Sequence, residues 1–365
     1  MLHQLLAEFD PTLALDHAKT IPNTWYTDAR ILDAERQAVF ARSWQAVGRT
    51  EQVRQPGSYL TANVAGEPIL VVRAEDGVLR GFFNVCRHRA APILNEPCGT
   101  ATKLRCRYHG WTYDLTGRLR GTPEFDGVCD FRKEDNGLVP VGGLAEWGPF
   151  VWVHLDVPRE PIEAFLSPLP EWVSGRKAFD GLRFVERREY TLACNWKVYV
   201  DNYLDGGYHV NTVHPGLADV LNYTEYTTTV HTFTSLQSSP LKPTEGTAGK
   251  TRTGDLAAYW WVYPNFMLNL YAGVMDTNLV LPLGPDRCRV VFDFYFADSI
   301  DPTFIRDSLA VADQVQAEDV GICEEVQRGL NSRSYTTGRF SVKREVGGYH
   351  FHCLLAQRLR EWVGA

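Results

Sequence analysis

Apolar residues recur with a helical period in parts of this sequence and with a strand period in others. A short amphipathic helix is predicted from Asp33 to Trp44, where the apolar residues fall near one stripe. From Ser58 onward, β-branched and aromatic runs alternate with turn residues such as Asp76-Gly77, a strong hairpin signal. These runs predict strands at Tyr59–Val64, Ile69–Arg73, Val78–Val85, Gly110–Leu115 and Phe150–Leu155. We therefore expect a small all-β domain in this part of the chain.

The second half of the chain carries longer elements. Strands are predicted at Tyr226–Leu236, Ala257–Tyr263, Asn278–Leu283 and Arg289–Phe296. A long helix is predicted from Pro302 to Leu330, and a C-terminal helix near His352 to Trp362. Strands followed by helices favour an α+β domain with an antiparallel sheet. The stretch Lys242–Asp255, rich in Thr and Gly, is expected to form a mobile loop.

The length of 365 residues exceeds what one hydrophobic core usually supports, so two domains are expected. Prolines at positions 158, 161, 168 and 170 mark the boundary between them. The expected division is a helical N-terminal segment of residues 1–44 that packs on the second domain, a β domain of residues 45–158, and an α+β domain of residues 159–365.

Composition and charge exclude several classes of protein. The formal net charge is -7 and there is no basic run, so neither nucleic acid nor an anionic membrane is an expected partner. No apolar run reaches the roughly 18 residues that span a bilayer, and no cationic region followed by an apolar one opens the sequence. We therefore expect a cytoplasmic protein. The eight cysteines are too sparse for a disulfide scaffold.

Two short motifs in the β-rich half each combine a cysteine with a histidine. Cys86-x-His88 is followed after 17 residues by Cys106-x-x-His109, and the two motifs are expected on loops that each follow a strand. A zinc finger usually puts both cysteines in one loop and both histidines in the other. The mixed arrangement is what a Rieske [2Fe-2S] cluster needs, with two thiolates on one iron and two imidazoles on the other. The alternatives are a zinc site and loop residues without a metal.

A second candidate metal site lies in the stretch from Asn195 to His214. If its first part is helical, Asp201, Asp205 and His209 fall at i, i+4 and i+8 on one face. His214 follows His209 closely enough to join it at one metal. Two neutral imidazoles and one carboxylate, with open positions left over, make the facial triad of non-haem Fe(II) centres. The alternative is a pair of partly buried histidines beside surface acids.

The third ligand is expected on the long predicted helix. Asp319 falls on the same stripe as Val315 and Ile322, and a carboxylate on the core side of a helix is costly unless it is paired or binds a metal. The alternative is a buried ion pair with an arginine. The neighbouring acids are expected to point to solvent: Glu318, Glu324 and Glu325.

Together, these motifs resemble the α subunit of Rieske non-haem iron oxygenases, the aromatic-ring-hydroxylating dioxygenase family, over nearly the whole chain. The residues that carry the resemblance are the four of the Cys/His motifs, Asn195-Trp196-Lys197, Asp205, His209, His214 and Asp319. It implies a Rieske domain, a catalytic domain of helix-grip type, and use of O2 in a monooxygenase or dioxygenase reaction. It also implies electrons from NAD(P)H through a ferredoxin or flavin reductase. We expect a mononuclear Fe(II) beside the [2Fe-2S] cluster.

The resemblance further implies a head-to-tail ring, commonly a homotrimer, in which an acid connects the cluster of one subunit to the iron of the next. Asp205 is the expected bridging acid. Many members of the family place this acid three residues before the first histidine, whereas Asp205 lies four before His209. Asp201 therefore stays an alternative, and Asn202 is counted with them as a candidate catalytic residue.

Within the family, the likeness is strongest to choline monooxygenases. The matching stretches are Asp201–His209, Pro264–Met267, Met275–Pro285, Val326–Leu330 and His350–Cys353. This likeness implies oxidation of an N-methyl group of a quaternary ammonium compound, and such a cation gains about 0.5 to 2 kcal/mol from each ring face. The candidate aromatic cage is Trp260, Trp261, Tyr263, Phe266 and Tyr271. An aromatic run with strand spacing is more often core.

Other readings of the function stay open. The same frame can serve an aromatic acid that is ring-hydroxylated or demethylated. A non-catalytic Rieske electron carrier would need only the β domain, and about 200 further residues with a facial triad argue against it. A structural zinc protein would be colourless.

Overall fold

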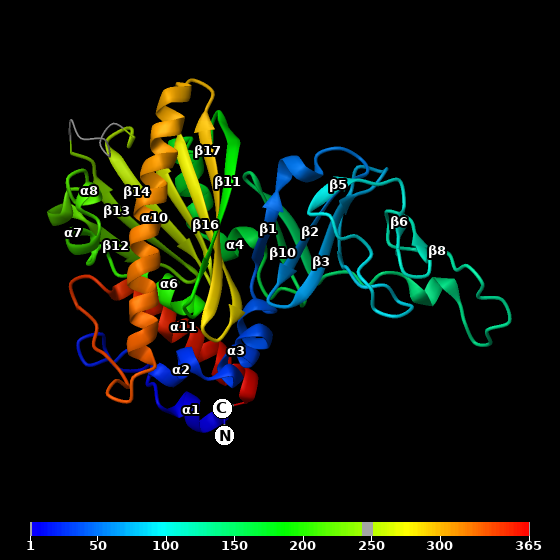
Figure 1. The fold of residues 1–365 in the computed structure, drawn as a ribbon, viewed down its shortest axis with the longest axis horizontal. Helices are drawn as coiled ribbons and strands as arrows, with labels where there is room; N and C mark the ends of the chain where they lie inside the picture. Colours follow the sequence, from blue (N-terminus) through cyan, green and yellow to red (C-terminus); the bar gives the residue numbers. More distant parts are fainter. Residues whose placement is uncertain (1, 243–250, 365) are drawn as a thin grey trace. The chain divides into compact units, whose positions relative to one another are not determined.

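The computed structural model describes residues 2–242 and 251–364, and it divides the chain into two compact units (Figure 1). One unit consists of Met1–Val39 together with Glu163–Ala365, and the other of Phe40–Ile162. The domain bounds at residues 44 and 158 stay a prediction, and the compact units change over a few residues away from them. The first part of the chain therefore belongs to the same unit as the second half.

The unit Phe40–Ile162 is built from three small antiparallel sheets. The first has the order β1-β10-β9, the second β4-β3-β2-β5 and the third β6-β7-β8. Their strands are β1 (Gln45–Arg49), β2 (Ser58–Val64), β3 (Glu67–Arg73), β4 (Leu79–Phe83), β5 (Cys98–Thr100), β6 (Leu104–Arg105), β7 (Thr112–Tyr113), β8 (Leu119–Gly121), β9 (Gly143–Trp147) and β10 (Phe150–His154). The short helices are η2 (Thr50–Val53) and η3 (Lys133–Asn136).

Local sequence explains the pairing in this unit. Gly77 takes a φ of +77°, as a tight turn requires, and β3 pairs with β4 on either side of it. Leu70, Val72 and Phe82 point into a core shared with Tyr113. The strand predicted at Gly110–Leu115 is shorter than expected, because the chain is still closing a loop at its start. The prediction of an all-β domain is confirmed.

The other unit is organised around one antiparallel sheet with the order β11-β17-β16-β15-β14-β13-β12. Its strands are β11 (Leu182–Leu192), β12 (Thr227–Val230), β13 (Thr234–Pro240), β14 (Leu256–Val262), β15 (Phe266–Tyr271), β16 (Val274–Gly284) and β17 (Arg287–Ala297). Its helices are α1 (Leu2–Ala7), α2 (Asn23–Thr27), α3 (Ala29–Glu35), α4 (Ile162–Leu166), α5 (Leu169–Arg176), α6 (Trp196–Tyr203), α7 (Val210–Val213), α8 (Pro215–Ala218), α10 (Pro302–Leu330) and α11 (Val346–Val363). Two single-turn elements, η1 (Arg36–Phe40) and η4 (Tyr223–Glu225), complete the chain.

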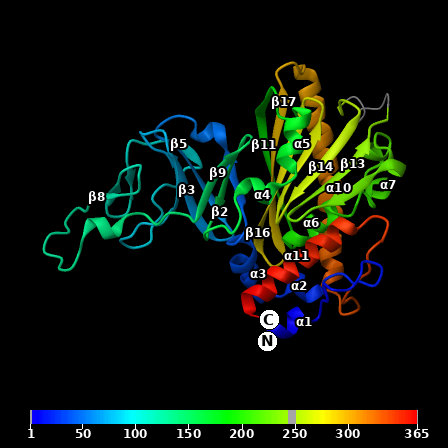
Figure 2. The same cartoon turned by 180° about the vertical axis from the view of Figure 1, so that it is seen from behind.

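Helices cover both faces of this sheet. In Figure 1 the long helix α10 runs along one face, with α6 between it and the strands. Figure 2, seen from behind, shows α5 on the opposite face. α11 lies beneath the sheet and packs against α1 and α3. This arrangement confirms the predicted α+β class, and α10 has the predicted bounds because Asp301 caps it and Pro302 opens it.

The register of the sheet brings polar side chains together on the face that α6 and α10 cover. Gln237, Tyr259, Asn269 and Asp276 lie directly opposite one another across β13, β14, β15 and β16. Residues opposite each other in antiparallel strands point to the same face. A polar row inside a domain is unusual, and it marks the part of the sheet that faces the candidate site.

Several predictions of secondary structure were wrong or incomplete. The helix predicted at Asp33–Trp44 is α3 followed by the single turn η1, so it begins earlier, at Ala29, and ends at Phe40. The single strand predicted at Tyr226–Leu236 is two strands, β12 and β13, because the chain turns at His231, whose N–H donates to Thr234 O at 2.8 Å. The strands that were not predicted are β11 and β15 in this unit and β1, β5, β6, β8 and β9 in the other. The C-terminal helix begins earlier, at Val346. Most of the loop expected at Lys242–Asp255 is residues 243–250, which lie outside the described residues.

Within residues 2–242 and 251–364, no helix combines the length and the apolar composition needed to cross a bilayer.

Candidate metal centres and substrate cavity

The end of α6 is where the first candidate site begins. Asn195 caps the helix by accepting the N–H of Lys197, and the helix ends at Tyr203. Gly206 and Gly207 both have a φ of +69°, and a Cβ on Gly206 would lie 2.1 Å from Arg344 O. The expected stacking of three residues along one continuous helix is therefore wrong, because glycines turn the chain before it reaches His209.

The turn nevertheless brings Asp205 to His209. Asp205 Oδ2 lies 2.5 Å from His209 Nδ1 and also accepts the backbone N–H of His209 at 3.0 Å. Its other oxygen accepts the N–H of Tyr208 at 3.0 Å. The carboxylate thus fixes both the ring and the backbone of His209, and it leaves the ring Nε2 pointing away from Asp205.

Three side chains converge where that Nε2 points. The ligand atoms of His209, His214 and Asp319 all lie within 4.8 Å of one another, and no other such group of three occurs among the described residues. His214 Nε2 is 3.1 Å from Asp319 Oδ1, and His209 Nε2 is 3.9 Å from the same oxygen. Asp319 lies on the buried side of α10, as predicted, although its buried neighbours on that side are Gln316 and Cys323 rather than the residues of the predicted apolar stripe. The two imidazoles and one carboxylate form a donor set that fits Fe(II).

Glu318, the residue before Asp319, is also part of this site. Its Oε2 lies 2.7 Å from His214 Nδ1, so the expectation that it points to solvent was wrong. His214 lies over the edge of α10 and meets both neighbouring carboxylates. Burial alone lowers the pKa of His214, but the carboxylates of Asp319 and Glu318 outweigh it and raise that pKa. Because a carboxylate holds Nδ1 of each histidine, Nε2 of each ring faces Asp319, the third candidate ligand.

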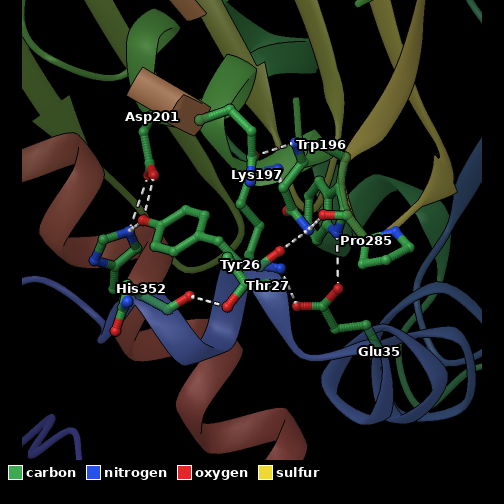
Figure 3. Close-up of polar contacts among 11 residues, drawn as sticks. Tyr26, Thr27, Glu35, Trp196, Lys197, Asp201, Pro285 and His352 are labelled. Atoms are coloured by element: carbon green, nitrogen blue, oxygen red, sulfur yellow. Dashed lines mark hydrogen bonds and ion pairs between the residues drawn. The ribbon is translucent and has the colours of Figure 1, made fainter. Parts of the chain in front are cut away.

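The remaining two candidates near the triad have different surroundings. Asn202 Nδ2 donates to Asp319 Oδ1 at 2.7 Å, so it contacts the candidate ligand directly. Asp201 does not reach the triad. It accepts a hydrogen bond from Tyr26 at 2.6 Å and lies 2.9 Å from His352 Nε2 (Figure 3). Asp201 therefore belongs to a separate polar cluster on the other side of α6.

That cluster explains the Asn195-Trp196-Lys197 segment. Lys197 Nζ lies 2.6 Å from Glu35 Oε1, and both side chains are fully buried. Trp196 Nε1 donates to the second oxygen of Glu35 at 2.8 Å (Figure 3). Burial lowers the pKa of Lys197 and raises that of Glu35, although each charge favours the other. These residues fasten α6 to α3, and so they position the site without contacting it.

In the other unit, the two Cys/His loops have matching backbones. The N–H of Cys86 donates to Ala91 O, and the N–H of Cys106 donates to Trp111 O, each five residues ahead. Ala90 and Gly110 both take positive φ values, 59° and 73°, and return a hydrogen bond to their cysteine. The loops therefore present one cysteine and one histidine each in similar frames.

The side chains of these loops fit a Rieske cluster. Cys86 and Cys106 are buried, and the rings of His88 and His109 lie 4.6 Å apart between centroids. His88 Nδ1 is buried and has no hydrogen-bond partner among the described residues, as expected of an atom that binds a metal. Burial and the neighbouring His109 lower the pKa of His88, which favours the neutral ring that ligation requires.

A cavity of about 130 Å³ adjoins the triad and is rich in tyrosine. Its aromatic lining consists of Tyr199, Tyr203, Tyr226, Tyr259, Tyr271 and Phe292. Of the five predicted cage residues, only Tyr271 is among them. The hydroxyl groups of Tyr259 and Tyr271 lie 2.9 Å apart, and the ring of Tyr259 stacks near that of Tyr226.

The other four cage candidates pack elsewhere, so this part of the prediction was wrong. Trp260 points to the opposite face of the sheet and contacts Trp172 of α5. Trp261 shares the cavity face but packs against Phe351 of α11. Tyr263 and Phe266 are buried beside the turn between β14 and β15. Successive strand residues face opposite sides, so an aromatic run cannot all face one cavity.

The cavity wall also carries two charged side chains that were not predicted. Asp276 Oδ2 accepts a hydrogen bond from Asn269 at 2.7 Å, and burial raises the pKa of Asp276 to about 6. Arg252 lies with its guanidinium carbon 5.0 Å from the centre of the Tyr271 ring. Beyond the carboxylates of Asp205 and Asp319 at the triad, the wall therefore holds one negative and one positive group at neutral pH.

Comparisons with known proteins agree with this geometry. Residues 43–132 match the Rieske [2Fe-2S] domain family, and residues 179–361 match the family of the ring hydroxylating alpha subunit (catalytic domain). The chloroplastic choline monooxygenase of Arabidopsis thaliana is 42% identical over 98% of this chain and 87% of its own length. The carnitine monooxygenase oxygenase subunit of Escherichia coli K12 is 32% identical, over 94% of this chain and 95% of its own.

Solved structures give the same result. The quaternary ammonium Rieske monooxygenase CntA in complex with L-carnitine has a TM-score of 0.82 and 30% identity, over 94% of this chain and 96% of that one. The two family matches follow one another along this chain, the Rieske [2Fe-2S] domain first and the catalytic domain second. This chain belongs to the Rieske non-haem iron oxygenases, as an oxidoreductase of the ring-hydroxylating α-subunit type.

Proposed function

We propose that this protein is the oxygenase subunit of a monooxygenase that hydroxylates an N-methyl group of a small quaternary ammonium compound. The observation that carries the proposal is the tyrosine-lined cavity beside the His209, His214 and Asp319 triad, with the acid Asp276 in its wall. The relatives are named for choline and carnitine, and both are quaternary ammonium compounds.

In this proposal His209, His214 and Asp319 hold Fe(II), while Cys86 and His88 with Cys106 and His109 hold the [2Fe-2S] cluster. Bound iron, supplied with electrons from the cluster, provides the O2 activation on which the reaction depends. The donor set and the orphaned Nδ1 of His88 support this assignment.

The protein's own contribution at the iron site is orientation. Asp205 and Glu318 hold the Nδ1 atoms of the two histidines, so that each Nε2 points inward. Asn202 donates to the Asp319 oxygen that faces both rings, which fixes the carboxylate and leaves its second oxygen available.

Recognition of the cation is assigned to ring faces and one negative charge. A trimethylammonium group cannot donate a hydrogen bond, so it is held by cation–π attraction and by Coulombic attraction. Each tyrosine face contributes about 0.5 to 2 kcal/mol, depending on how dry the site is. Asp276 adds attraction whenever it is ionised. An aromatic acid would use the rings and Arg252 but would leave Asp276 without a cation.

We further propose a homotrimer that is reduced by a ferredoxin or flavin reductase with electrons from NAD(P)H. In this trimer Asp205 connects His209 to a cluster histidine of the neighbouring subunit. The contacts of the two candidate acids support Asp205 over Asp201, since Asp201 is occupied by Tyr26 and His352.

A substrate screen tests the proposal. The purified protein, loaded with iron and cluster and supplied with NADH and a surrogate reductase, is given trimethylammonium compounds and, separately, aromatic carboxylates. We expect substrate-dependent oxygen uptake with the trimethylammonium compounds, and release of formaldehyde where the hydroxylated methyl group is lost. Oxygen uptake with aromatic carboxylates alone would refute the proposed substrate class.

A further inference from the structure

The cavity wall holds two opposite charges that do not pair with each other. Arg252 and Asp276 both line it. In the part of the chain that the structure describes, neither lies within 4.0 Å of an opposite charge. A buried or half-buried charge is costly unless something neutralises it, so unpaired charges in a substrate cavity point to the substrate.

Arg252 has weak partners within the protein. Its Nη1 reaches Thr251 only at 3.4 and 3.5 Å, which is long for a hydrogen bond. Its Nε is buried and has no hydrogen-bond partner among the described residues. A guanidinium offers five N–H donors in a planar fork, a geometry that matches a carboxylate.

The backbone keeps Arg252 in this position. Thr253, the next residue, accepts the N–H of Ala272 at 3.1 Å, at the turn between β15 and β16. The guanidinium of Arg252 lies 5.0 Å from the ring centre of Tyr271, the last residue of β15. Arg252 is therefore held against the end of β15, the strand that also carries Asn269.

Asp276 is not the missing partner of Arg252. It lies opposite Asn269 on the neighbouring strand and accepts a hydrogen bond from that side chain at 2.7 Å. Burial outweighs both Asn269 and Arg252 and raises the pKa of Asp276 to about 6. A close ion pair with an arginine would have lowered this pKa instead. The two charges are separate groups in one wall.

Different substrates would satisfy these charges to different degrees. A trimethylammonium alcohol such as choline would use Asp276 and the rings but would leave Arg252 unpaired beside a second positive charge. An aromatic acid would use Arg252 and face Asp276. A compound with both a quaternary ammonium and a carboxylate uses all of these groups.

We propose that the substrate is such a zwitterion and that Arg252 is the residue that binds its carboxylate, while Asp276 and the tyrosine rings hold its ammonium group. Arg252 then determines specificity between trimethylammonium carboxylates and trimethylammonium alcohols. This inference rests on the proposed function, because it concerns the same cavity.

The first test compares matched ligands on the unmodified protein. Choline and (trimethylammonio)acetate differ only in CH2OH against COO⁻, and γ-butyrobetaine has 4-(trimethylammonio)butanol as its alcohol. Binding to the iron- and cluster-loaded protein is measured by titration calorimetry. We expect at least one carboxylate to bind about 10- to 100-fold tighter than its alcohol.

Alcohols that bind as well as their carboxylates in every pair would overturn the inference and leave the proposed function standing. Failure of all four, with an aromatic acid bound instead, would refute the proposed function itself.

The second test removes the guanidinium. Arg252→Met should lower the ratio of kcat/KM for the carboxylate to that for its alcohol by about 10- to 100-fold, through KM. The KM for the alcohol should fall, since a like charge has been removed. Arg252→Lys keeps the charge but loses the fork, so it should recover part of the ratio.

The matched control is Arg306→Met on the exposed side of α10, where Asp307 is the only described residue with which Arg306 forms an ion pair. It should leave the ratio unchanged. An unchanged ratio in Arg252→Met would contradict the inference. If that variant does not fold, as judged by its thermal midpoint, Arg252→Lys and the matched ligands on the parent protein decide the question.

Discussion

The two candidate metal centres are held in place by different parts of the protein. At the cluster loops, backbone hydrogen bonds of two similar turns position Cys86 and Cys106. At the iron triad, side-chain carboxylates orient the two histidines: the nearby Asp205 holds His209, and Glu318 of the distant helix α10 holds His214. Backbone hydrogen bonds depend little on which side chains surround them, whereas one substitution can remove a side-chain hydrogen bond. The iron centre should therefore be the more sensitive of the two to mutations beyond its ligands.

The strongest way to separate the two centres is to remove a ligand of one. Asp319→Ala should abolish turnover and lose the catalytic iron, because two histidines alone do not complete the triad. The visible spectrum of the cluster should survive, since no cluster residue is touched. Iron content per chain and oxygen uptake are the measurements. Asp307→Ala, an exposed acid on the same helix, is the control, and full activity in Asp319→Ala would contradict the assignment.

The converse change acts on the cluster alone. His88→Cys should keep a [2Fe-2S] cluster but lower its potential by on the order of hundreds of millivolts, because an anionic ligand replaces a neutral one. Turnover should fall sharply while mononuclear iron is retained. Redox titration of the visible absorption gives the potential. His17→Cys adds a thiol at an exposed site as the control, and an unchanged potential in His88→Cys would rule out ligation by His88.

The next largest effect is expected from a change to Asp205, whose carboxylate holds His209. Asp205→Asn removes the charge and one acceptor, so both the orientation of His209 and the proposed path from the neighbouring cluster suffer. We expect both metals to remain and single-turnover rates of the pre-reduced protein to fall about 10- to 100-fold. Asp201→Asn should do less, because its partners Tyr26 and His352 lie away from the triad. A stalled Asp201→Asn beside a normal Asp205→Asn would reverse the assignment of the bridge.

Glu318 allows a finer test of the side-chain frame. Glu318→Gln keeps the size and one acceptor for His214 Nδ1 but removes the charge that makes the ring a better ligand. Iron affinity should fall about 10-fold, with the cluster unchanged. Glu325→Gln is the matched control on the same helix, since Glu325 is exposed and its ion pair within the described part of the chain is with Arg328, at 3.6 Å. Equal iron affinity in both variants would show that Glu318 does not support the site.

The same contrast explains what the sequence could predict. The cluster motifs are local, so their spacing alone indicates a Rieske site. Asp319 is far from His214 in the chain, and its inward position was predicted from the stripe of Val315 and Ile322. Those two residues are only partly buried, and the buried side of α10 around Asp319 carries Gln316, Cys323 and Gln327 instead. Glu318 was missed because it lies off that stripe, and only the position of His214 over the helix edge brings it into the site.

Strand contacts were harder to predict than metal ligands. The turn between β12 and β13 runs through His231, Thr232 and Phe233, with no Gly, Pro, Asn or Asp to mark it. The side of the sheet that a residue faces depends on register, so Tyr259 lines the cavity while Trp260 packs on α5. Arg252 carries no sequence signal either, because its role depends on the strand turn against which it is held.

The smallest effect expected is a pH dependence of cation binding that Asp276 creates. Its pKa is raised from the ordinary 3.8 to about 6 by burial, so the side chain is neutral below this pH and negative above it. Affinity for tetramethylammonium, a cation without a carboxylate, should therefore rise a few-fold between about pH 5 and pH 7.5.

The same pKa shift makes the folding stability change with pH in the opposite direction. The folded state binds the proton more tightly than the unfolded chain, so the contribution of Asp276 to stability is present below pH 3.8 and is lost as pH rises through about 6.

Asp276→Asn separates this effect from the titration of the histidines. The iron-loaded protein is used, because metal-bound imidazoles stay neutral over this range. Binding titrations at four pH values should give a flatter profile in the variant, with affinity at pH 7.5 reduced toward the parent value at pH 5. Thermal midpoints should show the opposite trend, with the variant losing less stability than the parent as the pH rises from 4 to 7. Parallel binding profiles in the two proteins would mean that the tyrosine rings hold the cation without help from Asp276.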